Sequence, residues 1–177
     1  MSIFTVNTTA DTVANDGKLS LREAVARANA TSGADTIRFT AALEGKILVL
    51  TGGELLLTRD LTIDGDRDND GKEVTISGGD VSRIFRITGG NTDVRLTDLA
   101  LTDGRTFAGG GAIYAEHATT LRLDQVTVSG NGAQPDDGGT QYSGGGILAL
   151  GDLVLAHCTI RGNYARDGGG SRPATSL

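Results

Sequence analysis

One phrase of sequence occurs three times: VRLTDLALTDG at residues 94–104, LRLDQVTVSGN at 121–131 and LVLAHCTIRGN at 153–163. Each copy has apolar residues at its first, third, sixth and eighth positions, and each ends in Asp-Gly or Gly-Asn. A glycine triplet follows each copy, at 109–111, 144–146 and 168–170. Repeats of this size are typical of architectures in which each unit stacks on its neighbours.

The spacing within the phrase predicts short strands separated by a corner. Apolar residues two apart point to one face of a strand, and the step from the third to the sixth position interrupts this alternation. The copies start 27 and then 32 residues apart, and the longer interval falls between Asn131 and Gly146, where it predicts a loop. We therefore predict an all-β parallel β-helix, or solenoid, of about five coils. A β-sandwich also has many short strands but does not predict three aligned copies.

The N-terminal region predicts an edge strand at Ile3–Thr8 and the one convincing helix of the chain at Leu19–Ala30. Ser20 and Glu23 have the spacing of a capping box. One helical face is apolar and consists of Leu21, Ala24, Val25 and Ala28. Because the terminal coil of a solenoid exposes its core, we expect this amphipathic helix to cap the stack. Binding of a partner by the helix is the alternative.

The remaining strands set the predicted organisation of the chain. They are expected at 36–39, 46–50, 54–57, 61–63, 74–76 and 83–87. This gives an N-terminal strand and capping helix (1–35), a β-helix (36–170) and an irregular tail (171–177). The tail has neither a strand pattern nor a capping pattern. We therefore expect that the chain is truncated or that a second copy covers its open C-terminal end as a homodimer.

The composition of the chain disfavours several classes of partner. The chain has 177 residues and a formal net charge of −6, without a Lys/Arg cluster, which disfavours nucleic acid and anionic membranes. No apolar run approaches the ~20 residues of a membrane span, so membrane insertion is not expected. No signal peptide is evident, so the chain is cytoplasmic, exported by another route, or a piece of a larger protein. The single cysteine, Cys158, occupies an apolar position and is predicted to be buried.

The N-terminal sequence resembles a known family. LSLREAV at 19–25, ANA at 28–30 and GADTIRF at 33–39 resemble the signature of bacterial surface proteins with the CSLREA motif. LTIDG at 61–65 and the glycine repeats resemble the right-handed parallel β-helix of these choice-of-anchor-type proteins and, more distantly, the pectate-lyase-like fold. The resemblance implies a right-handed coil and a secreted or cell-surface location, without an established enzymatic activity. Leu19 stands where the motif has its cysteine, and the usual long array and anchoring segment are missing.

The strongest chemical motif is DGDRDNDG at 64–71, which has the alternating aspartates and the glycine of the first half of an EF-hand calcium loop. Carboxylates at alternate positions of a tight loop converge on one point. The predicted metal ligands are the side chains of Asp64, Asp66, Asp68 and Asp70 and the carbonyl of Lys72. The predicted role of the calcium is structural.

The motif departs from an EF-hand at its twelfth position, where Ser77 replaces glutamate, so further oxygens must come from Glu73, Asp80 or water. An acidic solvated turn is the alternative. Four aspartates within seven residues, however, repel one another without a cation.

Other polar residues are weaker candidates. Asp136 and Asp137 could serve acid–base catalysis but fit an exposed loop better. His117 and His157 have no evident partner at a fixed position. Equal positions in the repeat are occupied by Arg95 and Arg122, by Asp98 and Gln125, and by Asn131 and Asn163. We expect the asparagines to form a hydrogen-bonded ladder, and the other pairs to form either a solvated face or a strip for a polysaccharide.

Three functions follow. The favoured one is a structural or adhesive β-helix module of a bacterial surface or secreted protein, stabilised by calcium and without catalytic activity. The second is a carbohydrate-active enzyme, a polysaccharide lyase or glycoside hydrolase, using the outer face; Arg67 and Lys72 are the basic residues nearest the calcium motif. The third is a self-assembly element that pairs through its uncapped C-terminal coil.

Overall fold

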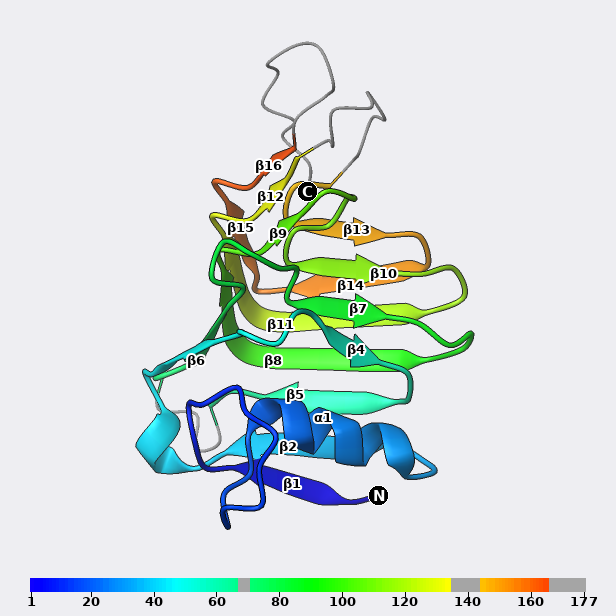
Figure 1. Cartoon of the computed structure of the whole chain (residues 1–177). Helices are drawn as coiled ribbons and strands as arrows, with labels where there is room; N and C mark the ends of the chain where they lie inside the picture. The colour runs from blue at the N-terminus through cyan, green and yellow to red at the C-terminus, as the bar shows by residue number, and fades with distance from the viewer. Residues whose placement is uncertain (67–70, 135–143, 166–177) are drawn as a thin grey trace.

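The computed structural model of the chain describes residues 1–66, 71–134 and 144–165. Parallel strands stack along one axis, and the single α-helix of the described residues lies at the N-terminal end of the stack (Figure 1). The predicted all-β, right-handed parallel β-helix is confirmed. No described helix is long and apolar enough to cross a membrane.

Three sheets form the faces of the coil. Sheet A follows the order β1-β2-β5-β8-β11-β14, with β3, β6 and β15 pairing beyond a corner. Its strands are β1 (Ile3–Val6), β2 (Asp35–Phe39), β3 (Ile47–Val49), β5 (Leu61–Asp64), β6 (Val74–Ser77), β8 (Asp93–Thr102), β11 (Thr120–Ser129), β14 (Asp152–Ala156) and β15 (Thr159–Arg161). Sheet B consists of β4 (Leu55–Leu57), β7 (Phe85–Ile87), β10 (Ile113–Ala115) and β13 (Ile147–Ala149). Sheet C consists of β9 (Arg105–Thr106), β12 (Gly132–Ala133) and β16 (Tyr164–Ala165).

Sheet B has four described strands, which corresponds to about four turns of the coil, whereas the sequence predicted about five. The difference lies at the two ends. At the start, β1 is followed by the helix rather than by strands of sheets B and C. At the end, β14, β15 and β16 belong to a turn for which no sheet B strand lies within the described residues.

The corner predicted within each phrase lies at its fifth residue. Asp98, Gln125 and His157 have φ values of 51°, 55° and 53°, a left-handed conformation in which the chain turns sharply. Equivalent residues of the phrases pair on both sides of the corner. Before it, Leu121 pairs with Val94 and with Leu153, and after it, Val128 pairs with Leu101 and with Ile160. The three phrases therefore stack position on position, as their alignment predicts.

The core is a set of apolar columns inside the coil. Val94, Leu96, Leu121 and Leu123 are at most 1% exposed, because each lies between equivalent residues of neighbouring turns. The exceptions to the predicted burial belong to the third phrase: Leu153 and Leu155 are 37% and 38% exposed, and Cys158 is partly buried and packs against the edge of the core. All three belong to the last described turn, so no described turn lies over them.

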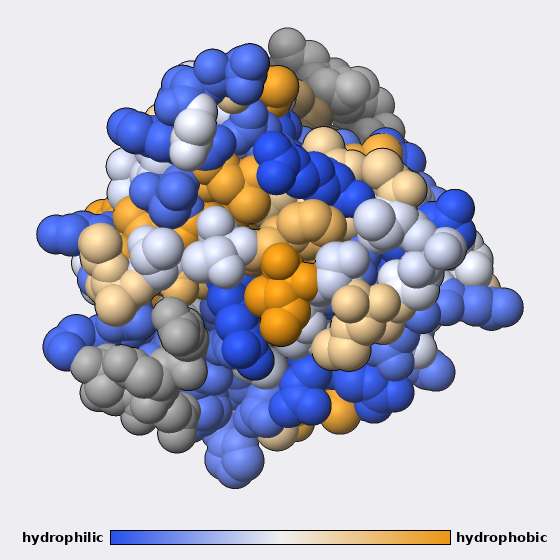
Figure 2. All heavy atoms as spheres, turned by 90° about the horizontal axis from the view of Figure 1, so that it is seen from below, coloured by the Kyte–Doolittle hydropathy of each residue, from blue (hydrophilic) through white to orange (hydrophobic). Residues whose placement is uncertain are grey.

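The helix α1 (Leu21–Ala30) caps the stack as predicted. The Ser20 side chain accepts a hydrogen bond from the Glu23 amide, and the Glu23 carboxylate accepts one from the Ser20 amide, which completes the capping box. The predicted apolar face is buried and consists of Leu21, Ala24, Val25 and Ala28. Seen from below, this end of the molecule is mainly hydrophilic around a group of apolar residues (Figure 2).

Asn29 completes the cap at the edge of sheet B. Its side-chain amide donates to the carbonyl of Leu56 at 2.7 Å and accepts from the amide of Thr58 at 3.0 Å. These are the backbone groups of β4 and its following residue that a neighbouring strand would otherwise pair. A side chain of α1 therefore takes the place of a strand. The short 3₁₀ helix η1 (Ala41–Leu43) links β2 to β3.

Candidate functional site

The predicted calcium motif lies at the corner of sheet A, between β5 and β6. Asp64 pairs with Thr97 and Val74 pairs with Leu99, so residues 65–73 occupy the place that Asp98 fills alone in the next turn. Gly65 starts this insertion by donating its amide to the carbonyl of Thr97 at 3.0 Å. The motif therefore falls, in sequence, at a corner that takes the single residue Asp98 in the next turn.

Three of the five predicted ligands fall within the described residues. Asp64 ends β5, with a side chain that is 20% exposed. Asp66 is 5% exposed, and its Oδ2 accepts a hydrogen bond from the amide of Gly71 at 2.7 Å. Lys72 is exposed beside Glu73. Asp68 and Asp70, together with Arg67, lie outside the described residues.

The described carboxylates form a group that we call the acidic corner: Asp64, Asp66, Glu73, Asp98 and Asp124. Burial raises the pKa of Glu73, and the negative charges of Asp98 and Asp66 raise it further. Burial also raises the pKa of Asp98, with contributions from Asp64, Asp66 and Asp124. The pKa of Asp64 is raised mainly by burial. Each of these three carboxylates is therefore less stable when ionised than it would be in water.

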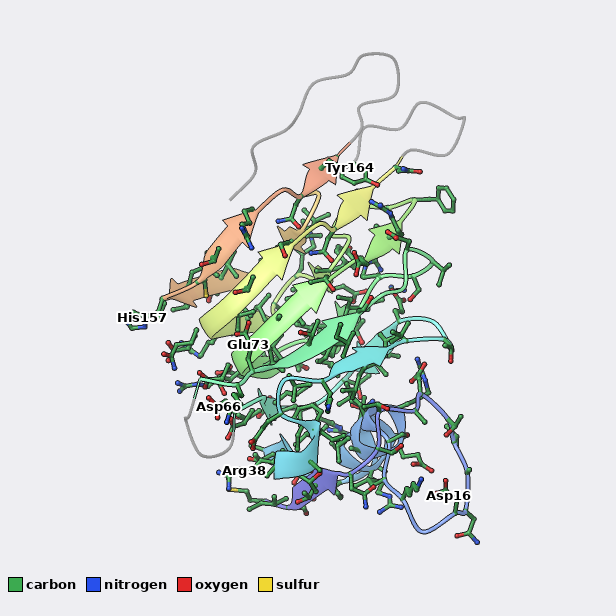
Figure 3. The ribbon with its side chains drawn as sticks, turned by 90° about the vertical axis from the view of Figure 1, so that its left-hand side faces the viewer. Asp16, Arg38, Asp66, Glu73, His157 and Tyr164 are labelled. Carbon is green, nitrogen blue, oxygen red and sulfur yellow. The ribbon has the colours of Figure 1, made fainter. Side chains whose placement is uncertain are left out.

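Cationic and polar side chains surround the acidic corner. Arg38 Nε lies 3.5 Å from Asp64 Oδ2, Arg95 Nη2 lies 3.1 Å from Asp124 Oδ2, and Gln125 Nε2 donates to Asp98 Oδ1 at 2.7 Å. Arg38 lies beside the corner because β2 pairs with β5 and places it opposite Asp64. Figure 3 shows Arg38, Asp66 and Glu73 along the same edge of the molecule. Sequence reasoning missed Arg38, although its place in the strand before LTID is the signal that could have found it.

Carboxylate oxygens at a loop are the ligands that calcium prefers, so the residues of the acidic corner fit such an ion by their chemistry. By themselves they do not form a site: within residues 1–66, 71–134 and 144–165, no three carboxylate, histidine or cysteine side chains are placed to hold a metal ion. Oxygens from the remainder of the predicted motif would be needed to complete a coordination shell.

The structure does not bring the other candidate residues, the two histidines and the Asp136–Asp137 pair, together in one site. His157 Nδ1 lies 3.1 Å from Asp124 Oδ1, a partner that sequence reasoning missed, but the histidine side chain is 80% exposed. His117 is exposed in the turn between β10 and β11. Asp136 and Asp137 lie outside the described residues. A histidine so open to solvent is a poor general base, since nothing fixes a reacting group beside it.

The two arginines that occupy equal positions in the repeat, Arg95 and Arg122, lie side by side on the outer face of sheet A. Arg122 is paired with Arg95 across β8 and β11, and each is neutralised by an acid: Arg122 Nε lies 3.3 Å from Asp93, and Arg95 contacts Asp124. A cavity of about 320 Å³ is lined by both arginines together with Asp60 and Asp93. We call this surface the polar strip.

The predicted asparagine ladder is confirmed on the corner that leads to sheet C. Asn131 is fully buried, and its Oδ1 accepts from the amide of Gly104 at 2.8 Å. Its Nδ2 donates to the carbonyl of Leu101 at 3.0 Å and to Asn163 Oδ1 at 2.9 Å. Both ends of its side-chain amide are hydrogen-bonded within the stack, so its role is structural.

Comparisons with protein-family models, with curated proteins and with solved structures give no match for this chain. The acidic corner and the polar strip are the two places from which its chemistry can be argued.

Proposed function

We propose that this chain is a structural or adhesive β-helix module of a bacterial surface or secreted protein, stabilised by calcium at the acidic corner and without catalytic activity. The observation that carries the proposal is the acidic insertion at a single-residue corner. A loop that adds carboxylates where Asp98 alone suffices in the next turn costs stability unless a cation offsets their repulsion.

The calcium ligands in this proposal are Asp64, Asp66, Asp68 and Asp70 with the carbonyl of Lys72. Asp64 belongs to the end of β5, and the loop leads directly into β6. An ion bound there would tie together the two halves of one turn of sheet A and hold the loop against the stack. Calcium takes six to eight oxygens, so water or Glu73 would complete the shell.

The surface location rests on the resemblance of the N-terminal stretch to the CSLREA signature. The residues that carry this resemblance form the cap: Ser20 and Glu23 close the capping box, and Leu21 and Ala24 are buried beneath the helix. A signature used to close the end of a β-helix suits a module that begins a solenoid.

Thermal unfolding with calcium and with a chelator tests the proposal. An ion that binds only the folded state stabilises it by about 2.7 kcal/mol at a hundredfold excess over its dissociation constant. We expect a rise of several degrees in Tm that Asp68→Ala abolishes and that Asp16→Asn, in an exposed loop at the opposite side, leaves intact. An unchanged Tm in millimolar calcium would contradict the calcium part of the proposal.

A second candidate function is suggested by the polar strip. Its cavity and its two outward arginines offer hydrogen-bond donors along a sheet face, as a bound polysaccharide would need. In this alternative the chain is a carbohydrate-active enzyme. Binding of an acidic polysaccharide that is lost in an Arg95→Ala/Arg122→Ala double variant, with release of shortened sugars, would favour it over the structural module. Absence of binding would remove it.

A further inference from the structure

Apart from Asp152 at its start, the outermost described strand at the C-terminal side of sheet A, β14, is apolar on both of its faces. Among the described residues, β14 pairs only with β11, so its other edge forms no described strand pair. We propose that β14 joins the β14 strand of a second copy of this chain, antiparallel and centred on Val154, to give a closed end-to-end dimer. This inference is independent of calcium and of the proposed location.

The inward residues of β14 continue the columns of the core but are not covered. Leu153 and Leu155 are 37% and 38% exposed. Their partners on β11, Leu121 and Leu123, are at most 1% exposed. The same leucine columns are therefore buried in one turn and open in the next, which indicates that a further layer of strand fits on this end.

The outward residue of β14 points to the same conclusion. The column that contains Thr62, Arg95 and Arg122 on successive strands ends with Val154, which is 45% exposed. Exposed edge strands normally carry charges that prevent pairing with another chain. Here the arginine found on two inner strands is replaced by valine on the edge, so this edge favours strand pairing.

The pattern of β14 is self-complementary when it pairs with itself in an antiparallel sense. With Val154 opposite Val154 of the partner subunit, Leu153 lies opposite Leu155 of the partner subunit and Asp152 lies opposite Ala156 of the partner subunit. The two-fold axis is perpendicular to sheet A, so inward leucines stay on the core side in both copies. No like charges face each other across this pair.

The opposite end of the stack is partly covered. There Val6 of β1 is fully buried and α1 covers the end of sheet B through Asn29, although Ile3 of β1, the other edge strand of sheet A, is 58% exposed. Head-to-tail addition would leave a helix between the two copies and would produce open filaments rather than a closed pair. The self-complementary pattern of β14 therefore favours a dimer with two-fold symmetry.

Light scattering after size-exclusion chromatography tests the dimer. We expect the full chain to have twice its 18.2 kDa mass, and Val154→Lys to return it to a monomer with an unchanged circular dichroism spectrum. The matched control is Leu56→Lys, since Leu56 is an outward residue with 44% exposure on the edge strand β4. It should stay dimeric. A monomer at all concentrations, or a dimer that Val154→Lys leaves intact, would overturn the proposal.

A cross-link tests the symmetry. In a Cys158→Ala background, Val154→Cys places two thiols opposite each other at a distance that a disulfide can span. Oxidation should give a covalent dimer, whereas Leu56→Cys should give none. A non-covalent dimer in which Val154→Cys does not cross-link, or a series of larger oligomers, would rule out the closed arrangement.

Discussion

The guanidinium of Arg22 forms a bidentate ion pair with the carboxylate of Asp11, with Nε 2.9 Å from Oδ1 and Nη2 2.9 Å from Oδ2. The amides of Thr51 and Gly52 donate to the same carboxylate at 2.7 and 2.8 Å. Arg22 Nη2 also donates to the carbonyl of Gly53 at 2.6 Å. The pair thereby joins the first loop, the capping helix and the turn between β3 and β4. Arg22 belongs to the LSLREAV stretch at 19–25, and this network gives it a structural role.

Arg22→Ala is expected to destabilise the chain by about 3 kcal/mol, because it leaves the carboxylate of Asp11 without its charged partner. The Asp11 side chain is only 3% exposed, so solvent cannot replace the guanidinium easily. Urea denaturation measures the loss. Arg27→Ala, in the exposed last turn of the same helix, is the control and should change the stability by less than about 0.5 kcal/mol. Equal effects of the two substitutions would show that the network adds nothing beyond helix propensity.

Asn131→Ala is expected to lower the free energy of unfolding by about 2 kcal/mol or more. It leaves the buried amide of Gly104 and the carbonyl of Leu101 without their hydrogen-bond partner. Asn163→Ala should cost less, because Asn163 is only partly buried and belongs to the last described turn. Chemical denaturation of both variants tests the order. A larger loss for Asn163 would mean that the ladder is held from the C-terminal end.

Gly65→Ala is expected to destabilise the corner by about 1–3 kcal/mol, because an added methyl group overpacks it. A Cβ on Gly65 would lie 2.1 Å from the carbonyl oxygen of Asp98 and 2.5 Å from Leu99 Cδ2. The matched control is Gly90→Ala, whose Cβ would meet nothing within 4 Å. If the two alanine variants melt at the same temperature, the close approach at the acidic corner is not needed for stability.

The acidic corner predicts a pH dependence with a definite sign. The pKa values of Asp64, Glu73 and Asp98 are raised in the folded state, so the folded state holds protons more tightly than the unfolded chain. Their contribution to stability is therefore present at low pH and is lost as the pH rises through the folded pKa values. Without calcium, Asp98→Asn should raise the Tm at neutral pH and should lose this advantage in mildly acidic buffer.

For Asp11 we expect a pH dependence of stability opposite in sign to that of the acidic corner. Burial pushes the pKa of Asp11 upward, but the hydrogen bonds from Arg22, Gly52 and Thr51 outweigh it and lower the pKa. Its contribution is present at neutral pH and is lost as the pH falls, so Asp11→Asn should destabilise the chain at neutral pH. Melting curves across pH in chelator measure both variants. A lower Tm for Asp98→Asn at neutral pH in chelator would contradict the repulsion argued for the acidic corner.

Local signals in the sequence predicted most of the fold. The phrase that recurs in β8, β11 and β14–β15 gave the strand faces and the corner at Asp98, Gln125 and His157. The capping box at Ser20 predicted the start of α1. Sheet C was missed, because its strands have two residues each and such a short segment carries no periodicity. The partial burial of Cys158 was missed because an apolar repeat position does not reveal whether another turn covers it.

The sequence by itself determined that this chain is a repeating coil with a helical N-terminal cap, because the spacing of apolar residues, glycines and capping residues is read within a few positions. Only the tertiary structure placed Arg38 against Asp64, put the aspartate motif at a corner and left Leu153 and Leu155 exposed in the last described turn. These relationships join residues one turn of the coil apart or depend on what covers the last turn. They are fixed by the pairing of neighbouring strands, which no local pattern records.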